Sequence, residues 1–488
     1  MTTTLISSHT TPADLKGRRA LVVGLGESGL AMARWLHQQQ AHIAVVDTRS
    51  QPPGFAALAT AVPAAEWRSQ GVALEGTVMD ACLVDVDLLV LSPGVAFDSP
   101  LVRAALQRGI PVWSEVDCFQ VARRAACPAS KVLAITGANG KTTTTALTAH
   151  VLNAAGVDAV ACGNISPSLL DAFMARQAAG CWPAVWVLEL SSFQLEATQC
   201  MASDAAIILN LSEDHLDRHY TMAGYAAAKG RVYQQCAHPL WNRADLWADA
   251  YGLDQCVAQS IGDDTPSRDS DFGLDQGAIV RGTVSLVATD SLPLLGRHNA
   301  LNVQAALALA CHALPAGQTI TDLLPGVQSF RSLPHRVSLV ATVDDVRYVD
   351  DSKATNVGAT LAAIDGLYDP RHPNRKLALL LGGEGKGQDF SPLTSVVERA
   401  GRAVALIGKD AATIAAVLPA LLPVERFADL PAATRWLADQ AQPGDTVLLS
   451  PACASLDMFR NYAERAQVFV NTVHQLNRCT PLKDGEAA

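Results

Sequence analysis

The sequence lacks the cysteine pattern of a disulfide-bonded or zinc-binding protein. Its eleven cysteines are odd in number and scattered, and no two of them form a C-x-x-C pair. Disulfide frameworks and zinc sites use paired or closely spaced cysteines. We therefore exclude a cystine scaffold and a zinc domain, and we expect a protein of the reducing cytoplasm.

Long apolar runs, basic stretches and repeats are also missing. No uncharged apolar run reaches the roughly 18–20 residues of a membrane-spanning helix, and the polar residues 1–14 do not resemble a secretory signal. The formal net charge of -10 argues against non-specific binding to nucleic acid or to an anionic membrane. We find no internal repeat and no low-complexity segment.

What the chain does have is length and an ordinary globular composition. Its 488 residues, 49% of them hydrophobic, predict about three domains. Apolar strands alternate with helical segments, which indicates α/β domains with mostly parallel sheets. Stretches 127–130 and 332–336 look like linkers, so we predict domains at 1–128, 129–332 and 333–488. We expect disordered tails at 1–12 and 480–488.

A glycine-rich segment near the middle predicts a phosphate-binding loop. The apolar strand Val132–Ile135 is followed by Gly137-Ala138-Asn139-Gly140-Lys141-Thr142-Thr143 and then by a helical segment. Glycines let backbone N–H groups surround phosphate oxygens, Lys141 can reach the terminal phosphates, and Thr142 can ligate Mg2+. The pattern is G-x-x-G-K-T, shorter than the usual G-x-x-x-x-G-K-[ST]. The alternative is a glycine turn with an exposed lysine.

A second glycine motif lies near the start of the chain. G-L-G-E-S-G (24–29) stands between the strand Arg19–Val23 and a helix that extends to about Gln39. The next strand, Ile43–Val46, ends in Asp47-Thr48-Arg49. This arrangement is typical of a dinucleotide-binding βαβ unit, but the same turn can receive any nucleotide diphosphate. Asp47 could bind a ribose or a base edge and Arg49 a phosphate; a turn needed only for packing is the alternative.

Acidic residues follow two further strands of the middle part. Glu189 ends the strand Ala184–Leu190, as a Mg2+-binding acid does after a phosphate loop; alternatively it caps the next helix. The strand Ala205–Leu209 leads into an acid- and His-rich turn that contains His215. Lys229 lies in a helix over 225–231. Taken alone, His215 is a polar surface residue and Lys229 a solvated one.

The patterns in the rest of the chain, from residue 236 onward, are less distinct. Residues 236–293 suggest a small antiparallel appendage, followed by a helix at 303–313. In the third domain we expect strands that end at Asp351 and others at 376–381, 404–407 and 446–449, and a helix that starts at Ser352-Lys353-Ala354-Thr355-Asn356.

Seven segments in this order resemble one known family. They are G-A-N-G-K-T, L-E-L-S-S-F-Q-L-E, E-D-H-L-D-R-H, G-R-H-N-A-L-N, L-P-H-R, D-D-S-K-A-T-N and S-P-A-C-A-S-L-D, within residues 137–457. Together they resemble the Mur ligases of peptidoglycan synthesis, and most closely the members that add D-glutamate to UDP-N-acetylmuramoyl-L-alanine. The resemblance implies a Rossmann-like N-terminal domain for the UDP part, a central P-loop-type ATPase domain and a Rossmann-like C-terminal domain for the amino acid.

The resemblance also implies site residues. The implied ATP contacts are Gly137, Ala138, Asn139, Gly140, Lys141, Thr142, Thr143, Asn299, Asn302, Arg336 and Asp350 or Asp351. The implied substrate contacts are Glu27, Ser28, Asp47, Thr48, Arg49, Ser92, Pro93, Gly94, Asn164, Lys353, Thr355, Lys386, Ser455 and Tyr462. The implied Mg2+ ligands are Thr142, Glu189, His215 and Lys229, with Lys229 carrying a carbamate derived from CO2. Lys141, His215 and Lys229 would be the catalytic residues.

The implied reaction forms an acyl phosphate from ATP and the substrate carboxylate, which the amine of D-glutamate then attacks. Domain closure about two hinges would exclude water, and His215 and the substrate phosphate are both candidate bases. Two positions depart from the family pattern: Ser166 replaces a glycine and Tyr462 a frequent phenylalanine. We expect a monomer without a macromolecular partner. A ligase for another amino acid, a folylpolyglutamate synthetase, an NAD-dependent oxidoreductase and a non-catalytic nucleotide-sugar sensor remain alternatives.

Overall fold

The computed structural model describes residues 12–251, 253, 258–294, 296, 298–331 and 333–479. Two compact units make up the chain: residues 1–211, 218–286 and 303–327 form unit 1, and residues 212–217, 287–302 and 328–488 form unit 2. The predicted tails 1–12 and 480–488 lie outside the described residues, except for Pro12. Arg297 and Ser332, which belong to two of the sequence segments named above, also lie outside them. None of the helices described is long and apolar enough to cross a membrane.

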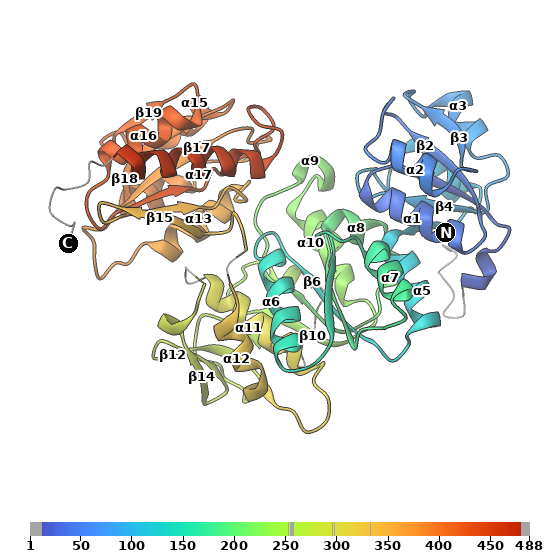
Figure 1. Ribbon diagram of the computed structural model, residues 1–488, viewed down its shortest axis with the longest axis horizontal. Helices are drawn as coiled ribbons and strands as arrows, with labels where there is room; N and C mark the ends of the chain where they lie inside the picture. Colours follow the sequence, from blue (N-terminus) through green and yellow to red (C-terminus); the bar gives the residue numbers. More distant parts are fainter. Residues whose placement is uncertain are drawn as a thin grey trace, which may run out of the picture. The chain divides into compact units, whose positions relative to one another are not determined.

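The first sheet, in unit 1 and drawn mostly in blue in Figure 1, has its β2, β3 and β4 labelled there. It contains five parallel strands in the order β3-β2-β1-β4-β5. They are β1 (Arg19–Val23), β2 (His42–Asp47), β3 (Glu66–Gln70), β4 (Leu88–Leu91) and β5 (Val112–Ser114). The helices between and after them are α1 (Glu27–Gln38), α2 (Phe55–Ala61), α3 (Gly76–Cys82), α4 (Pro100–Gln107) and α5 (Glu115–Ala126). Alternate strand residues enter two separate apolar clusters, as in parallel sheets covered on both faces. The predicted Rossmann-like domain is confirmed.

The central sheet, also in unit 1, has six strands in the order β11-β10-β9-β6-β8-β7, and all its pairings are parallel. The strands are β6 (Lys131–Thr136), β7 (Ala159–Gly163), β8 (Val185–Glu189), β9 (Ser203–Ile208), β10 (Cys236–Asn242) and β11 (Gln259–Ile261). The helices of this region are α6 (Lys141–Ala154), α7 (Leu169–Ala178), α8 (Ser192–Ala197), α9 (Leu216–His219), α10 (Met222–Gly230), α11 (His298–Cys311) and α12 (Leu324–Ser329). The phosphate loop lies between β6 and α6, as predicted.

The prediction of an antiparallel appendage over 236–293 is wrong for its first part. Strands β10 and β11 extend the central sheet in parallel. Only β12 (Phe272–Asp275), β13 (Ala278–Arg281) and β14 (Val284–Ala288) form a small separate sheet, in which β12 and β13 are antiparallel. The sequence does not predict strand β10, because most of its residues are not buried and it contains Pro239. It therefore has neither an apolar run nor a clear alternation of apolar and polar residues.

The third sheet, in unit 2, has the order β15-β16-β20-β17-β18-β19 and is parallel except for the β15–β16 pair. The strands are β15 (Ser338–Val343), β16 (Val346–Asp350), β17 (Leu377–Gly382), β18 (Gly401–Ile407), β19 (Val424–Arg426) and β20 (Thr446–Leu449). The helices are α13 (Val357–Leu367), α14 (Leu393–Ala400), α15 (Ala411–Val417), α16 (Leu430–Gln440) and α17 (Tyr462–Cys479). Helices α13, α14 and α15 cover one face and α16 and α17 the other.

Helix α13 starts later than predicted. We expected it to begin at Ser352, but the helix begins at Val357, and Asn356 caps it by accepting a hydrogen bond from Ala359 N. The residues before it form a turn because Asp350 Oδ1 accepts a hydrogen bond from Ser352 N at 2.9 Å. Aspartate side chains often compete with helix formation in this way.

Helix α5 ties the first sheet to the central one within unit 1. Asp117 Oδ1 accepts hydrogen bonds from Gln199 N at 2.9 Å and Cys200 N at 2.8 Å. Phe119 packs edge-on against Trp186 of β8, with ring centroids 5.4 Å apart. One apolar cluster contains residues of both sheets. The two α/β layers of unit 1 are therefore packed as one body through this helix.

Candidate functional site

Two turns meet at the carboxyl edge of the first sheet. The glycine turn follows β1, and Gly24 N donates a hydrogen bond to Val46 O at 2.9 Å. A Cβ on Gly29 would lie 2.0 Å from Gly24 O, so only glycine permits the tight start of α1. Ser92, which is buried, begins the Ser-Pro-Gly turn after β4, and a Cβ on Gly24 would lie 3.0 Å from its Cβ. The structure thus brings the glycine turn that precedes Glu27 and Ser28 close to Ser92, at the edge of the sheet where parallel sheets bind ligands.

Asp47 is an internal anchor at this edge of the sheet. Its carboxylate accepts a hydrogen bond from Leu25 N at 2.7 Å and two from the Arg49 guanidinium at 2.7 and 2.9 Å. Burial favours the neutral carboxyl, but the hydrogen bonds outweigh it and lower the pKa of Asp47. The Arg49 side chain remains half exposed, and Thr48 is exposed as well. Arg49 is therefore oriented by Asp47 and available to a ligand.

The phosphate loop is held from the neighbouring strand. Ala138 N donates to Asn210 O at 2.8 Å and Asn139 N to Asn210 Oδ1 at 2.9 Å. Gly140 has a φ of +82° and directly precedes α6, which begins at Lys141. Lys141 Nζ donates to the carbonyl oxygens of Gly137 and Ala138, both at 2.8 Å. The loop, the lysine and the helix N-terminus thus lie together, as a phosphate-binding loop requires, and binding of an anion there stays a prediction.

Glu189 lies next to the loop strand, at the end of β8. It is 2% exposed; Oε1 accepts a hydrogen bond from Asn164 Nδ2 at 2.9 Å, while Oε2 has no hydrogen-bond partner among the described residues. Helix α8 is instead capped by Ser191, together with Gln194. The alternative role of Glu189 as a helix cap is thereby excluded. A buried carboxylate oxygen without a donor suits a metal ion.

Lys229 is buried, not solvated as its sequence context alone indicates. It is 1% exposed, and its Nζ donates to Gly137 O at 2.9 Å and Thr136 Oγ1 at 3.3 Å. The same nitrogen lies 4.7 Å from the centre of the Tyr225 ring. Lys229 on α10 therefore reaches the start of the predicted phosphate loop, and its role as a carbamylated Mg2+ ligand stays a prediction.

The donor set fits Mg2+ only if Lys229 carries an acidic group. No three His, Cys, Asp or Glu side chains within the described part of the chain are grouped as a metal site. The predicted set has only two such residues, Glu189 and His215. Mg2+ prefers oxygen ligands, which the Thr142 hydroxyl and a carbamate on Lys229 would add.

The predicted adenosine contacts of unit 2 lie in two segments, the start of α11 and the start of the third domain. Asp351 is buried and accepts hydrogen bonds from Ser450 Oγ at 2.8 Å and Val337 N at 3.3 Å. Burial raises its pKa to about 7, although Ser450 and the charge of Arg336 oppose that shift. Asn302 Nδ2 donates to Asn299 Oδ1 at 2.8 Å, in the first turn of α11.

The predicted amino-acid contacts lie at the carboxyl edge of the third sheet. Lys353 Nζ is 3.8 Å from the centre of the Tyr462 ring, a cation–π contact that a phenylalanine would also provide. Ser455 is buried after β20, Thr355 is half-buried, and Lys386 is exposed in the glycine-rich turn after β17. The Tyr462 departure thus keeps the aromatic ring in contact with a predicted substrate residue.

The other departure is also compatible with the local backbone. Ser166 is not among the residues with positive φ, so its side chain causes no strain in the turn after β7. Gly163 cannot be replaced as easily, because it has a φ of +121° and an added Cβ would lie 2.3 Å from Glu189 O.

The structure brings the predicted residues together in two groups. Unit 1 contains the phosphate loop with Glu189, Lys229 and Asn164, and the uridine-side residues of the first domain. Unit 2 contains the adenosine-side and amino-acid residues together with His215, which has a φ of +55° and lies 3.6 Å from Asp214. Assembly of both groups into one site stays a prediction.

Sequence reasoning missed several residues that support the site. Asn210, which orders the phosphate loop, was readable as a polar residue at the end of a strand next to β6. Arg218 donates to Val95 O at 2.9 Å and pairs with Glu196, which links the Ser-Pro-Gly turn to α8. No sequence signal indicates these long-range contacts.

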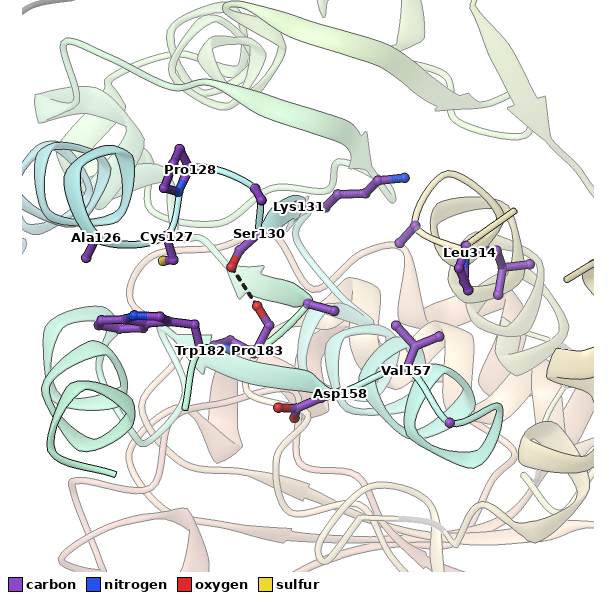
Figure 2. Close-up of a pocket in the computed structure, with 15 residues that line it drawn as sticks. Ala126, Cys127, Pro128, Ser130, Lys131, Val157, Asp158, Trp182, Pro183 and Leu314 are labelled. Atoms are coloured by element: carbon purple, nitrogen blue, oxygen red, sulfur yellow. Dashed lines mark hydrogen bonds between the residues drawn. The ribbon is translucent and has the colours of Figure 1, made fainter. Parts of the chain in front are cut away.

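A cavity of about 700 Å3 opens at the other end of the central sheet (Figure 2). Ser130 Oγ, at its wall, donates to Pro183 O at 2.6 Å. None of the predicted site residues lines this cavity. The predicted linker 127–130 is thus packed against the start of the central sheet, away from the phosphate loop.

Comparisons with known proteins agree with this arrangement. Family models for the MurD-like N-terminal domain of Mur ligases, the Mur ligase middle domain and the glutamate ligase domain of Mur ligases match residues 18–114, 135–310 and 335–453. The UDP-N-acetylmuramoylalanine–D-glutamate ligase of Dechloromonas aromatica is 53% identical, over 95% of this chain and 99% of the relative. The enzyme of the same name from Aromatoleum aromaticum is 46% identical, over 95% and 98%.

Solved structures show the same fold at low identity. UDP-N-acetylmuramate-alanine ligase MurC from Thermotoga maritima matches with a TM-score of 0.56 and 16% identity, over 94% of this chain and 99% of that one. A pseudomurein peptide ligase from Methanothermus fervidus matches with a TM-score of 0.54 and 14% identity, over 94% and 100%. Both the fold and the near full-length sequence matches lead to one conclusion: the chain belongs to the Mur ligase family, in the branch with a MurD-like N-terminal domain.

Proposed function

We propose that the chain catalyses the ATP-dependent addition of D-glutamate to UDP-N-acetylmuramoyl-L-alanine, a step of peptidoglycan precursor synthesis that releases ADP and phosphate. The observation that carries the proposal is the match at 53% identity, over 95% of the chain, to a relative named for this activity. The glycine turn near Arg49 and the loop at Lys141 support it, since the reaction needs both a uridine-diphosphate site and an ATP site.

A carboxylate does not acylate an amine at neutral pH, so it must first be activated. The carboxylate of the substrate attacks the γ-phosphorus of ATP and gives an acyl phosphate and ADP. The neutral amine of D-glutamate then attacks the acyl carbon, and the tetrahedral intermediate expels phosphate. Two anions approach each other in the first step, and Lys141 with the N-terminus of α6 compensates their repulsion.

Glu189, Thr142, His215 and a carbamylated Lys229 are the proposed Mg2+ ligands. When bound, Mg2+ neutralises charge on the transferred phosphoryl group. Asn164 holds Glu189 in place, and the buried position of Lys229 protects a carbamate from water. The unpaired Oε2 of Glu189 supports this assignment. The role of His215, as ligand or as partner of the acyl phosphate, depends on how the two units meet.

Each of the three domains is expected to bind one substrate, as the resemblance to the family implies. We propose that residues 1–128 bind the UDP part, residues 129–332 bind ATP, and residues 333–488 bind D-glutamate. We also propose that the protein acts as a monomer in the cytoplasm, where ATP and UDP-linked precursors are available.

Formation of ADP in a panel of amino acids tests the function. The full-length protein is incubated with Mg-ATP, UDP-N-acetylmuramoyl-L-alanine and either D-glutamate, L-glutamate, L-lysine or diaminopimelate. We expect ADP only with D-glutamate, and none when the uridine substrate is omitted. Use of another amino acid with refusal of D-glutamate would point to another ligase. Tight NAD binding without uridine-nucleotide binding would favour an oxidoreductase, and nucleotide binding without turnover a sensor.

A further inference from the structure

One arginine of unit 2 is completely buried in the first turn of α17 and has no part in the reaction described above. Arg465 is 0% exposed. Its guanidinium donates three hydrogen bonds, and none of the three acceptors is a carboxylate. A buried cation is costly, and an apolar side chain of similar length would often be tolerated equally well in its place. What this arginine contributes is therefore to be sought in the groups that its N–H donors hold.

Two of the three hydrogen bonds hold the turn after β16. Arg465 Nε donates to Ser352 Oγ at 3.0 Å, and Nη2 donates to Ser352 O at 2.8 Å. Ser352 Oγ donates in turn to Tyr462 O at 2.8 Å, so two residues of the first turn of α17 hold this serine. The next residue is Lys353, a predicted amino-acid contact whose Nζ lies against the Tyr462 ring. Arg465 therefore fixes the backbone beside Lys353.

The third hydrogen bond holds the turn after β20. Arg465 Nη1 donates to Cys453 O at 3.0 Å. The preceding residue, Ala452, has a φ of +61°, and Gln388 Nε2 donates to its carbonyl oxygen at 2.8 Å. A residue with a Cβ keeps such a left-handed conformation only where its surroundings hold it. Arg465 and Gln388 thus hold two successive carbonyl groups of a turn that leads to Ser455, another predicted amino-acid contact.

The turn after β17 is joined to the turn after β20. Glu384 N donates to Ala454 O at 3.0 Å, and Ala454 N donates to Glu384 O at 2.9 Å. A Cβ on Gly383 would lie 2.2 Å from Ala454 O, so the two turns are in close contact. Lys386 follows in the turn after β17. The three turns that carry the predicted amino-acid contacts are therefore connected, and Arg465 links two of them directly.

We propose that Arg465 is a positioning residue for the incoming amino acid, because its guanidinium holds the turns after β16 and β20 at the spacing that D-glutamate requires. A guanidinium is planar and presents its N–H groups in fixed directions, so one side chain can hold two backbone segments at a set distance. The inference rests on the proposed function for the identity of the amino acid, but its geometry is that of unit 2 alone.

The charge of Arg465 adds to this geometric role. Burial lowers the pKa of Arg465 to about 10, although nearby acids such as Asp457 oppose the shift, so the side chain is still a cation at neutral pH. A positive charge enclosed by protein acts more strongly than one in water. It therefore favours a dicarboxylate at this edge of the sheet over a neutral amino acid.

The test uses the full-length protein with the variants Arg465→Lys and Arg465→Met, and with Arg402→Met as the matched control. Arg402 also belongs to the third domain, where it pairs with Asp445 at 2.8 Å and donates to Asn374 O at 3.0 Å. It lies at the start of β18, at the amino edge of the sheet. The control therefore removes an arginine with comparable contacts from the edge that carries no predicted contact.

Two measurements separate the steps of the reaction. Steady-state kinetics give kcat and the KM for D-glutamate, ATP and the uridine substrate. Hydroxylamine replaces D-glutamate in the second assay: its nitrogen attacks the acyl carbon of the acyl phosphate, phosphate leaves, and a hydroxamate forms. The hydroxamate reports the first step without the amino-acid site.

We expect both Arg465 variants to raise the KM for D-glutamate about tenfold or more, since a displacement of about 1 Å can cost about 100-fold in rate. The KM for ATP, the KM for the uridine substrate and hydroxamate formation should be unchanged. Arg465→Lys keeps the charge but cannot hold both turns. Arg402→Met should lower only the melting temperature. In a double-mutant cycle, Ser352→Ala and Arg465→Met should be non-additive for the KM of D-glutamate.

An Arg465→Met variant that, like the control, loses only thermal stability would overturn the inference. So would a loss of hydroxamate formation as large as the loss of D-glutamate addition, because the damage would then be general. If the methionine variant does not fold, Arg465→Lys decides, and a wild-type KM for D-glutamate in it would overturn the inference. Failure of the proposed function is distinguishable: the wild type would then form no ADP with D-glutamate, while the KM of the amino acid that it does use still judges Arg465.

Discussion

Asn164 and Glu189 are joined by a hydrogen bond of 2.9 Å between Nδ2 and Oε1, while Glu189 Oε2 stays buried and unpaired among the described residues. The bond orients a carboxylate at the end of β8 so that one oxygen is free for a ligand. It connects two residues that the sequence places in different roles, one with the substrate and one with the metal ion.

Replacement of Asn164 by Ala should therefore weaken Mg2+ binding as well as substrate binding. Loss of a group that orients a metal ligand costs about 10- to 100-fold in metal affinity, so the Mg2+ concentration at half-maximal rate should rise by at least tenfold. A Mg2+ titration of ADP formation measures it. Ser166→Gly is the control, because Ser166 lies in the same turn and the structure describes no hydrogen bond from it to Glu189. An unchanged Mg2+ requirement in Asn164→Ala would remove this residue from the metal site.

Lys229 should be carbamylated in the active protein. Lys229→Ala is expected to abolish nearly all turnover, and the wild type should lose activity in buffer depleted of bicarbonate, because the lysine then returns to an ammonium that repels Mg2+. With 13C-labelled bicarbonate, an NMR signal of a carbamate should appear in the wild type and be absent from Lys229→Ala. A fully active protein without that signal would show that Lys229 only holds the loop carbonyl of Gly137.

The ring of Tyr462 should matter for D-glutamate, and its hydroxyl should not. Tyr462→Phe keeps the cation–π contact with Lys353, so the KM for D-glutamate should stay within about twofold. Tyr462→Leu loses the contact, worth about 1 kcal/mol, and the KM should rise roughly fivefold. Steady-state kinetics with D-glutamate as the varied substrate measure both. Equal KM values for the two variants would show that the ring does not position Lys353.

The stability of the protein should report the ionisation of Glu115. Its pKa is raised by burial from an ordinary 4.5 to about 7 in the folded protein, so the unfolded chain releases this proton first as pH rises. Stability is therefore lost between about pH 4.5 and pH 7, by roughly 3 kcal/mol in total for this group. Glu115→Gln cannot ionise, so its stability relative to the wild type should increase from pH 5 to pH 8.

Urea unfolding at pH 5, 6, 7 and 8 checks this expectation. The comparison with the wild type removes the contributions of other buried acids, such as Asp117 and Asp351, whose pKa values are also raised by burial. A difference in free energy of unfolding that is constant with pH would show that Glu115 is not neutral in the folded protein.

Much of the fold was predictable because its strands are short apolar runs with clear ends. Strand β1 occupies Arg19–Val23 and β20 Thr446–Leu449, both as predicted, and the glycine turns mark where the strands stop. Polar edge strands were not predictable: β3 contains Glu66, Arg68 and Gln70 and has no apolar face of its own. Such strands form because a neighbour such as β2 offers unpaired backbone groups.

The sequence predicts the residue types of the candidate site but not the contacts that support them. The motif around Lys141 predicts a phosphate loop from local sequence alone, and the structure places that segment between β6 and α6. The bond between Asn164 and Glu189, by contrast, joins residues at the ends of the adjacent strands β7 and β8, whose pairing the sequence does not state. The burial of Glu115 was not predictable from the sequence. An acid at the start of a helix is ordinarily exposed, and Glu115 is buried because α7 packs against α5.

The way α5 is shared has a consequence for how the chain folds. A fragment that ends at residue 128 would contain a complete five-stranded sheet, yet it would expose Phe119 and leave Asp117 without Gln199 and Cys200. The first and central layers should therefore melt in a single cooperative transition, and during synthesis the first sheet would gain its full stability only after the chain had passed residue 200. A sequence module and a folding unit are not the same thing in this molecule.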